Sequence, residues 1–152
     1  MSDPRARLKE LGLRLPEVAA PVAVYLPAVQ SGSHVYVSGQ VPMVDGQLAA
    51  TGKVGNGVSP DHAKDLARTC ALNAMAAIDA LVGLERVVKV VKLVGFVASA
   101  PGFTGQPAVI NGASELFGAV FGEAGRHARS AVGVAELPLD APVEVEVIVE
   151  VS

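Results

Sequence analysis

The chain has 152 residues, of which 51% are hydrophobic and only 18% are charged, and its formal net charge is −3. This length predicts one compact domain over residues 1–152, and the surplus of apolar residues indicates that part of the surface meets another subunit. The acidic balance and the lack of a basic run argue against a nucleic-acid partner, and no apolar run reaches the roughly 20 residues that a membrane-spanning helix needs.

The N-terminal segment, residues 1–20, is expected to be an accessory arm. Residues 4–13 favour a short helix, with Pro4 near its first position and leucines that supply apolar contacts. The segment is charged and lacks the apolar core of a signal peptide, and Cys70 is the only cysteine of the chain, which excludes an internal disulfide. We therefore expect a cytoplasmic protein.

Two strands are expected next, on either side of a turn at residues 31–33. The first of them carries Tyr25, and the second ends at Ser38 and Gly39. Residues 44–58 contain several glycines and show no periodicity, and they predict a loop.

Two long helices follow, with one strand between them. The Ser-Pro-Asp sequence at 59–61 predicts a helix start, and apolar residues then recur at helical spacing until Gly83. Residues 86–99 are rich in β-branched side chains and predict a strand, and Pro107 opens a second helix that ends before Gly122. Alanine on the inner face of the first helix predicts that this helix lies close against a sheet.

The last two strands lie on either side of residues 137–142, so the order is two strands, helix, strand, helix, two strands. This order predicts an α+β fold whose helices cover one face of a sheet. In the last strand, the valines at alternate positions from Val143 to Val151 form the core face. In the strand before it, we expect Ser130, Val132 and Val134 to face the core and Arg129, Ala131 and Gly133 to face away.

Common catalytic and metal-binding motifs are missing. No nucleophile elbow, cysteine pair or zinc-protease helix occurs, and the three histidines lie in different elements, so we expect no metal and no cofactor. Cys70 lies on the apolar stripe of the first long helix, which is typical of a buried hydrophobic residue. Glu144 opens the last strand on its outer face, where a solvated surface would explain it without any chemistry, and periodicity alone favours that interpretation.

Four segments together change this picture. They are "YVSGQVPMVDG", "LNAMAAIDALVGLERVVKVVKLVGFV", "FTGQPAVINGASELF" and "RSAVGVAELPLDAPVEVEVIVEV". From about Tyr25 to Val151 the chain resembles the Rid family, the reactive intermediate deaminases also called YjgF-like or endoribonuclease L-PSP proteins. The resemblance implies a chorismate-mutase-like α+β fold, a mixed β-sheet with two long helices on one face, assembled as a homotrimer with clefts between subunits. It also implies cofactor-independent hydrolysis of 2-imino or enamino acids to 2-keto acids and ammonia, as in a 2-iminobutanoate/2-iminopropanoate deaminase.

The resemblance also assigns roles to individual residues. Arg129 matches the arginine that grips the substrate carboxylate, and a guanidinium suits this role because it stays charged and can donate two parallel hydrogen bonds. Glu144 matches the acid that positions or activates the attacking water. The remaining cleft positions are Tyr25, Ser38, Gly39, Asn111 and Ala131, the last of which stands where many members have a cysteine.

The strand pattern adds a geometric expectation. Arg129 starts one strand and Glu144 starts the next, so in antiparallel strands their side chains lie near opposite ends of one subunit, too far apart to hold one small acid. A working site then requires Arg129 of one chain to meet Glu144 of its neighbour, and the monomer is expected to be inactive.

Two other functions stay open at this point. A binding protein could use the same cleft to hold a small carboxylate without converting it, and it would need Arg129 but not Glu144. The family's older interpretation as a ribonuclease or translation inhibitor fits the acidic balance least. Ala131, the residues before Tyr25, the N-terminal arm and the 44–58 segment all depart from the family pattern and indicate a divergent subgroup whose pocket accepts another substrate.

Overall fold

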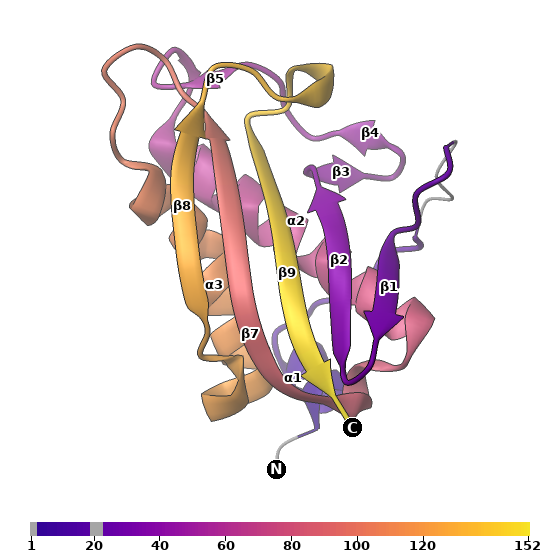
Figure 1. The fold of residues 1–152 in the computed structure, drawn as a ribbon. Coiled ribbons are helices and arrows are strands. Elements are labelled where there is room, and N and C mark those ends of the chain that lie inside the picture. The colour runs from indigo at the N-terminus through magenta and orange to yellow at the C-terminus, as the bar shows by residue number, and fades with distance from the viewer. Residues whose placement is uncertain (1–2, 19–22) are drawn as a thin grey trace.

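The computed structural model describes residues 3–18 and 23–152, and its centre is a five-stranded sheet with the order β1-β2-β9-β7-β8 (Figure 1). Strands β7 and β8 run parallel, and the other neighbours in this sheet are antiparallel, so the sheet is mixed as expected. Its strands are β1 (Ala28–Ser31), β2 (His34–Gln40), β7 (Val87–Ala98), β8 (Ala128–Val134) and β9 (Val143–Val151).

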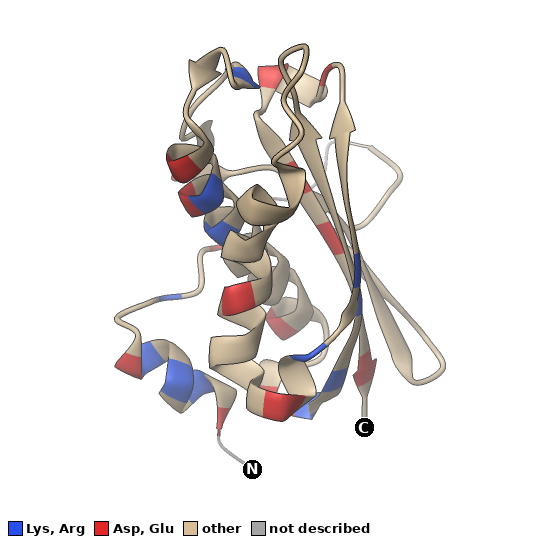
Figure 2. Ribbon diagram, turned by 90° about the vertical axis from the view of Figure 1, so that its left-hand side faces the viewer, with Lys and Arg blue, Asp and Glu red and all other residues tan. Residues whose placement is uncertain are grey.

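Two long helices, α2 (Pro60–Leu81) and α3 (Gln106–Phe121), cover one face of the sheet, which confirms the predicted fold class (Figure 2). Helix α2 begins where the sequence predicts, because the side chain of Ser59 accepts a hydrogen bond from the amide of His62 and a proline follows it. Three short 3₁₀ helices connect other elements: η1 (Leu84–Arg86), η2 (Gly122–Gly125) and η3 (Pro138–Asp140). No helix of the described ranges is both long and apolar enough to cross a bilayer.

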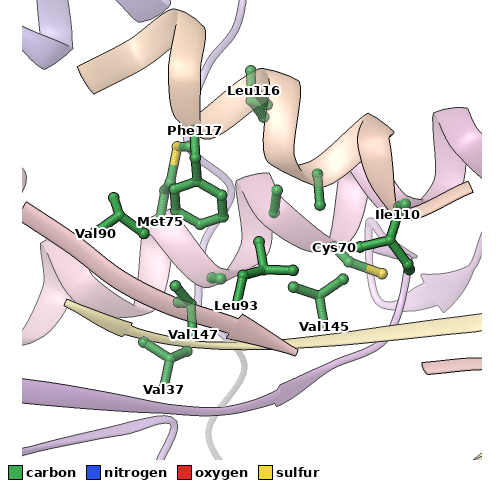
Figure 3. Close-up of a cluster of buried hydrophobic side chains, with 14 of the residues drawn as sticks. Val37, Cys70, Met75, Val90, Leu93, Ile110, Leu116, Phe117, Val145 and Val147 are labelled. Atoms are coloured by element: carbon green, nitrogen blue, oxygen red, sulfur yellow. The ribbon is translucent and has the colours of Figure 1, made fainter. Parts of the chain in front are cut away.

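The alternating valines of β9 face the helices as predicted, and all five are buried. Figure 3 shows Phe117 of α3 and Met75 of α2 in one cluster with Leu93 of β7. Cys70 belongs to the same core and is fully buried, and burial raises the pKa of its thiol well above the usual value. The expectation that Cys70 is a structural hydrophobic residue is therefore confirmed.

The prediction for the faces of β8 is wrong. Arg129 pairs with Leu93 in the parallel ladder, and Ala131 pairs with Gly95. Paired residues point to the same face of a sheet, and Leu93 is fully buried under the helices, so the arginine and alanine face the helices. Val132 points to the uncovered face and is 42% exposed. The small residues of β8 are needed on the helix side because α3 packs closely there, and an added Cβ at Gly133 would lie 2.7 Å from Gln106 Nε2.

The 44–58 segment is not a plain loop. Strands β3 (Met43–Val44) and β4 (Gln47–Leu48) form a small antiparallel hairpin, and β5 (Lys53–Val54) pairs in parallel with β6 (Gly57–Val58). The hairpin turn has φ values of 52° at Asp45 and 80° at Gly46, the conformation that an Asp-Gly pair favours between two strands. Two-residue strands are too short to show an alternating pattern, which is why periodicity missed them.

Tyr25 does not belong to the first strand, contrary to expectation. Strand β1 begins at Ala28, directly after Pro27, whose nitrogen has no hydrogen to donate to a ladder. Tyr25 lies three residues before the strand and is 62% exposed. Residues 19–20 at the end of the predicted arm and residue 22 at the start of the predicted strand lie outside the described ranges.

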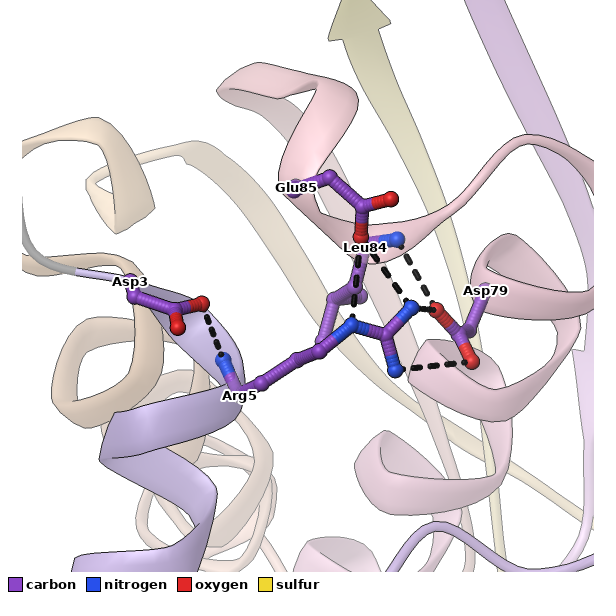
Figure 4. Close-up of polar contacts among 5 residues, drawn as sticks. All are labelled: Asp3, Arg5, Asp79, Leu84 and Glu85. Atoms are coloured by element: carbon purple, nitrogen blue, oxygen red, sulfur yellow. Dashed lines mark hydrogen bonds and ion pairs between the residues drawn. The ribbon is translucent and has the colours of Figure 1, made fainter.

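The N-terminal helix α1 (Pro4–Glu10) is fixed to the body by its first turn (Figure 4). The guanidinium of Arg5 forms ion pairs with Asp79 at the end of α2 and with Glu85 of η1. Leu8 on the same helix is only 4% exposed and belongs to the hydrophobic core. The helix therefore packs against the core through Leu8 and is oriented by Arg5.

Candidate functional site

Arg129 is held by helix α3. Its Nη1 donates to Asn111 Oδ1 over 2.7 Å and to Ser114 Oγ over 3.2 Å. Asn111 and Ser114 are three positions apart and so share one face of the helix. Both hydrogens of Nη1 are thereby used, whereas within the described ranges Nε and Nη2 have no hydrogen-bond partner. These two nitrogens form an edge of the guanidinium that can bind a carboxylate through two parallel hydrogen bonds.

A second set of contacts continues from Ser114. Its Oγ lies 2.9 Å from Nε2 of His127, and Nδ1 of His127 lies 2.7 Å from the carbonyl oxygen of Gly125. The imidazole also packs edge-on against Phe117, with ring centroids 6.3 Å apart and an interplanar angle of 71°. The guanidinium of Arg129 is therefore the end of a connected polar chain between α3 and β8.

Glu144 lies on the opposite side of the sheet. It pairs with Phe96 of β7, and its neighbours Val143 and Val145 both face the helices, so its side chain points to the uncovered face. The pKa of the Glu144 carboxyl is raised, first because partial burial removes water from the carboxylate and then because the negative charge of Glu146 lies nearby. A carboxylate with a raised pKa binds a proton more readily near neutral pH, as a general base must.

Gly39 provides the space that Glu144 occupies. A Cβ at position 39 would lie 2.9 Å from both Cδ and Oε2 of Glu144, so any larger residue would displace the carboxyl. Gly39 lies in an irregularity of β2, where the pairing with β9 shifts register between Val37 and Gln40. The β2 backbone therefore makes room for the acid at this position.

Ser38 connects Gly39 to the segment that carries Tyr25. The hydroxyl of Ser38 donates to the carbonyl oxygen of Leu26 over 2.6 Å, and its amide donates to that of Pro27 over 2.9 Å. Tyr25 is the residue before Leu26. The structure thus brings Ser38, Gly39 and Glu144 together and ties the Tyr25 segment to them.

The predicted site residues form two groups within one chain. The first, which we call the arginine group, consists of Arg129, Asn111 and Ala131 on β8 and α3. The second, which we call the glutamate group, consists of Glu144, Ser38 and Gly39 on β9 and β2, with Tyr25 in the adjoining segment. The arginine group lies on the helix side of the edge strand β8, and the glutamate group lies two strands away on the uncovered side.

The expectation that Arg129 and Glu144 lie at opposite ends of one subunit is wrong. Arg129 is level with Leu93 of β7 and Glu144 is level with Phe96, so only three positions along β7 divide them, or about 10 Å at strand spacing. The two side chains do not lie at opposite ends of the subunit. They are kept apart by pointing to opposite faces of the sheet, with β7 between their strands.

Two surface hollows of the described chain lie elsewhere. One, of about 520 Å³, is lined by residues of the N-terminal arm and Asp79, and the other, of about 390 Å³, lies between that arm and the outer sides of α2 and α3. Neither includes Arg129 or Glu144. Over residues 3–18 and 23–152, no group of three or more His, Cys, Asp or Glu side chains has a geometry that could hold a metal ion.

Sequence reasoning did not anticipate the roles of Ser114 and His127 beside Arg129. The three histidines lie in different elements, and the contact of His127 with Ser114 of α3 forms only in the folded chain. Two spacings could have found this cluster: Asn111 and Ser114 are one helical turn apart, and His127 lies directly before the strand that carries Arg129.

Comparison with known proteins shows what the chain resembles. The model of a family described as "YjgF/chorismate_mutase-like, putative endoribonuclease" matches residues 5–151. Protein TCP17 of Trypanosoma cruzi is 48% identical over 149 residues, which cover 97% of this chain and 93% of that protein. A 2-iminobutanoate/2-iminopropanoate deaminase of Dermatophagoides farinae is 35% identical over 138 residues, 90% of this chain and 93% of the other. The crystal structure of Atu1372, a protein of unknown function from Agrobacterium tumefaciens, superposes with a TM-score of 0.92 at 48% identity and covers 98% of this chain and 92% of that one.

Proposed function

Because the chain belongs to the YjgF-like or Rid family, we propose that it hydrolyses reactive 2-imino acids to 2-keto acids and ammonia without a cofactor. The observation that carries the proposal is the arrangement of Arg129. Asn111 and Ser114 occupy only Nη1, so the Nε and Nη2 edge stays available for a substrate carboxylate. A protein named as an imine deaminase is 35% identical over 90% of this chain, which supports the same reaction.

Glu144 is assigned to the water. In the first step the water oxygen bonds to the imine carbon as the carbon–nitrogen π bond breaks. One water proton goes to the Glu144 carboxylate and the imine nitrogen takes up a proton from solvent, which gives a tetrahedral carbinolamine. In the second step the remaining carbon–nitrogen bond breaks and the hydroxyl proton returns to solvent as the carbonyl forms. The proton held by Glu144 passes to the departing nitrogen, which leaves as ammonia. The raised pKa of Glu144 suits a group that accepts and returns one proton in each cycle.

The two residues are proposed to meet between subunits of a homotrimer. Within one chain the carboxylate and guanidinium point to opposite faces of the sheet, so one small substrate cannot contact both. The uncovered sheet face around Glu144 also exposes Val29, Tyr36 and Val132 by 42–44% each. A neighbouring chain that packs its β8 edge on this face would bury these apolar side chains and bring its Arg129 to Glu144.

The test follows hydrolysis of 2-iminopropanoate generated in situ. Wild type is expected to accelerate hydrolysis over buffer, and Arg129→Ala and Glu144→Ala are each expected to lose most of that acceleration. His62→Gln is the control, because His62 is exposed on α2, outside both groups of site residues. No acceleration by wild type across several imino acids, together with retained binding of 2-oxobutanoate, would favour a carboxylate-binding protein instead.

A further inference from the structure

We propose that Ser114 and His127 are positioning residues that hold the guanidinium of Arg129 ready for a substrate carboxylate. This proposal rests on the proposed function, in which Arg129 binds that carboxylate. It starts from a chain of hydrogen-bonding groups in which each lies within hydrogen-bond distance of the next. The chain runs from the carbonyl of Gly125 through His127 and Ser114 to Arg129.

For a neutral imidazole at His127, the partners fix the direction of each hydrogen bond in the chain. The carbonyl oxygen of Gly125 can only accept, so Nδ1 of His127 carries the hydrogen. In a neutral imidazole Nε2 is then an acceptor, and the hydroxyl of Ser114 donates to it over 2.9 Å. The lone pairs of the Ser114 oxygen are thereby turned toward Nη1 of Arg129, at 3.2 Å. His127 thus fixes the direction of the Ser114 hydroxyl, and that hydroxyl fixes the orientation of the Arg129 guanidinium.

Packing keeps the imidazole in this position. Its ring contacts Phe117 edge-on, and Phe117 is fully buried in the core between α3 and the sheet. Gly125 is also buried, and a Cβ there would lie 2.3 Å from the carbonyl oxygen of Phe117, so the chain after α3 approaches the helix closely. The first member of the chain is therefore anchored to the rigid part of the molecule.

This arrangement matters for function because it decides which nitrogen donors of Arg129 remain free. Asn111 and Ser114 together use both hydrogens of Nη1, which prevents the guanidinium from rotating about the bond between Nε and Cζ. The Nε and Nη2 edge then keeps one direction, and a carboxylate that binds it loses less rotational freedom of the arginine. Loss of Ser114 would leave Asn111 as the single restraint on Nη1, and loss of His127 would leave the Ser114 hydroxyl free to turn its lone pairs away from Nη1.

The first test measures KM and kcat for 2-iminopropanoate. Ser114→Ala and His127→Phe are each expected to raise KM about tenfold and to change kcat less than about twofold, since the carboxylate is bound in the ground state and in the transition state alike. His127→Gln, whose side-chain oxygen can replace Nε2 as acceptor, is expected to restore KM to within about twofold of wild type. A merely structural role would instead lower kcat through loss of folded enzyme and leave KM unchanged. His62→Gln, an exposed histidine on α2, is the matched control.

The second test does not require turnover. NMR of the arginine side chains measures the rate of rotation about the Nε–Cζ bond of Arg129, and this rate is expected to rise severalfold in Ser114→Ala and His127→Phe. Equal rates in wild type and both variants would overturn the positioning role, whatever the activity. If wild type hydrolyses imino acids and Ser114→Ala has the KM of wild type, the positioning role is wrong while the proposed function stands. If wild type hydrolyses none, the proposed function fails and the rotation rates still decide the positioning role.

Discussion

Arg129 and Glu144 point to opposite faces of one sheet. The guanidinium lies on the helix side, where Asn111 and Ser114 hold it, and the carboxyl lies on the uncovered side in the space that Gly39 leaves. Strand β7 separates their strands and pairs Leu93 with Arg129 and Phe96 with Glu144. In a single chain each side chain therefore forms only half of the site proposed above, and each half can be tested separately.

Replacing Glu144 by Gln should slow the reaction without weakening substrate binding. The amide keeps the size of the side chain but cannot accept a proton from water, so we expect kcat for 2-iminopropanoate to fall about 10²- to 10⁴-fold and KM to change only a few-fold. Steady-state kinetics measures both constants. An unchanged kcat in this variant would show that Glu144 takes no part in the proton transfer.

Gly39→Ala should disturb the site while leaving the fold intact. The new methyl group would lie 2.9 Å from Cδ and Oε2 of Glu144, and the carboxyl is the end of a flexible side chain that can move away. We expect kcat to fall about tenfold, because a displacement of about 1 Å is enough to impair proton transfer. Thermal unfolding should show little loss of stability. Equal activity of Gly39→Ala and wild type would mean that this position of the carboxyl is not required.

The raised pKa of Glu144 predicts a pH-dependent stability. The folded chain binds this proton more tightly than the unfolded chain, so the contribution of the group to the free energy of unfolding is greatest below the ordinary pKa of 4.5 and decreases as the pH rises toward the raised value. The Glu144→Gln variant has no ionisable group at this position, so it does not undergo this decrease in the free energy of unfolding. In an Arg129→Ala background, which lacks the guanidinium that a neighbour could supply, the stability advantage of Gln over Glu should therefore grow as the pH rises above 4.5 and then level off. Thermal unfolding across this pH range tests the sign, and an advantage that stays flat or shrinks would contradict the raised pKa.

Helix packing gives a matched pair of glycine substitutions on α3. A Cβ at Gly112 would lie 2.0 Å from the carbonyl oxygen of Lys64 on α2, and backbone cannot move aside as a side chain can. Gly112→Ala should therefore destabilise the fold by about 1–3 kcal/mol. Among the described residues, none lies within 4 Å of a Cβ added at Gly118, so Gly118→Ala should stabilise the helix by about 0.5–1 kcal/mol. Denaturant unfolding measures both, and a Gly112→Ala variant at least as stable as wild type would contradict the close approach of α2 and α3.

Strong periodicity was sufficient for much of the fold. Every second residue of β9 is a valine, and the start of α2 carries a hydroxyl, a proline and an acid in order, so both elements could be predicted from the sequence. In β8 the same reasoning failed, because it assumed that the larger residues face the core. The helix α3 lies so close to this edge strand that small residues face it, and Val132 is left on the uncovered side.

The candidate site could be predicted only in part. The resemblance supplied Arg129 and Glu144, but the strand pattern placed both on the outer face of the sheet. Only the pairing of Arg129 with the buried Leu93 shows that Arg129 faces the helices. The contact of Ser114 with His127 joins a helix to the strand that follows it, which no pattern within a single element can show.

Mixed oligomers test the meeting of Arg129 and Glu144 across a subunit boundary most directly. Arg129→Ala and Glu144→Ala chains, each inactive alone, would be mixed in equal amounts and allowed to reassemble. If each site takes its arginine from one chain and its glutamate from another, about one quarter of the sites receive both intact residues, and activity should recover to about one quarter of the wild-type value. A mixture that exchanges subunits and stays as inactive as either parent would contradict the shared site.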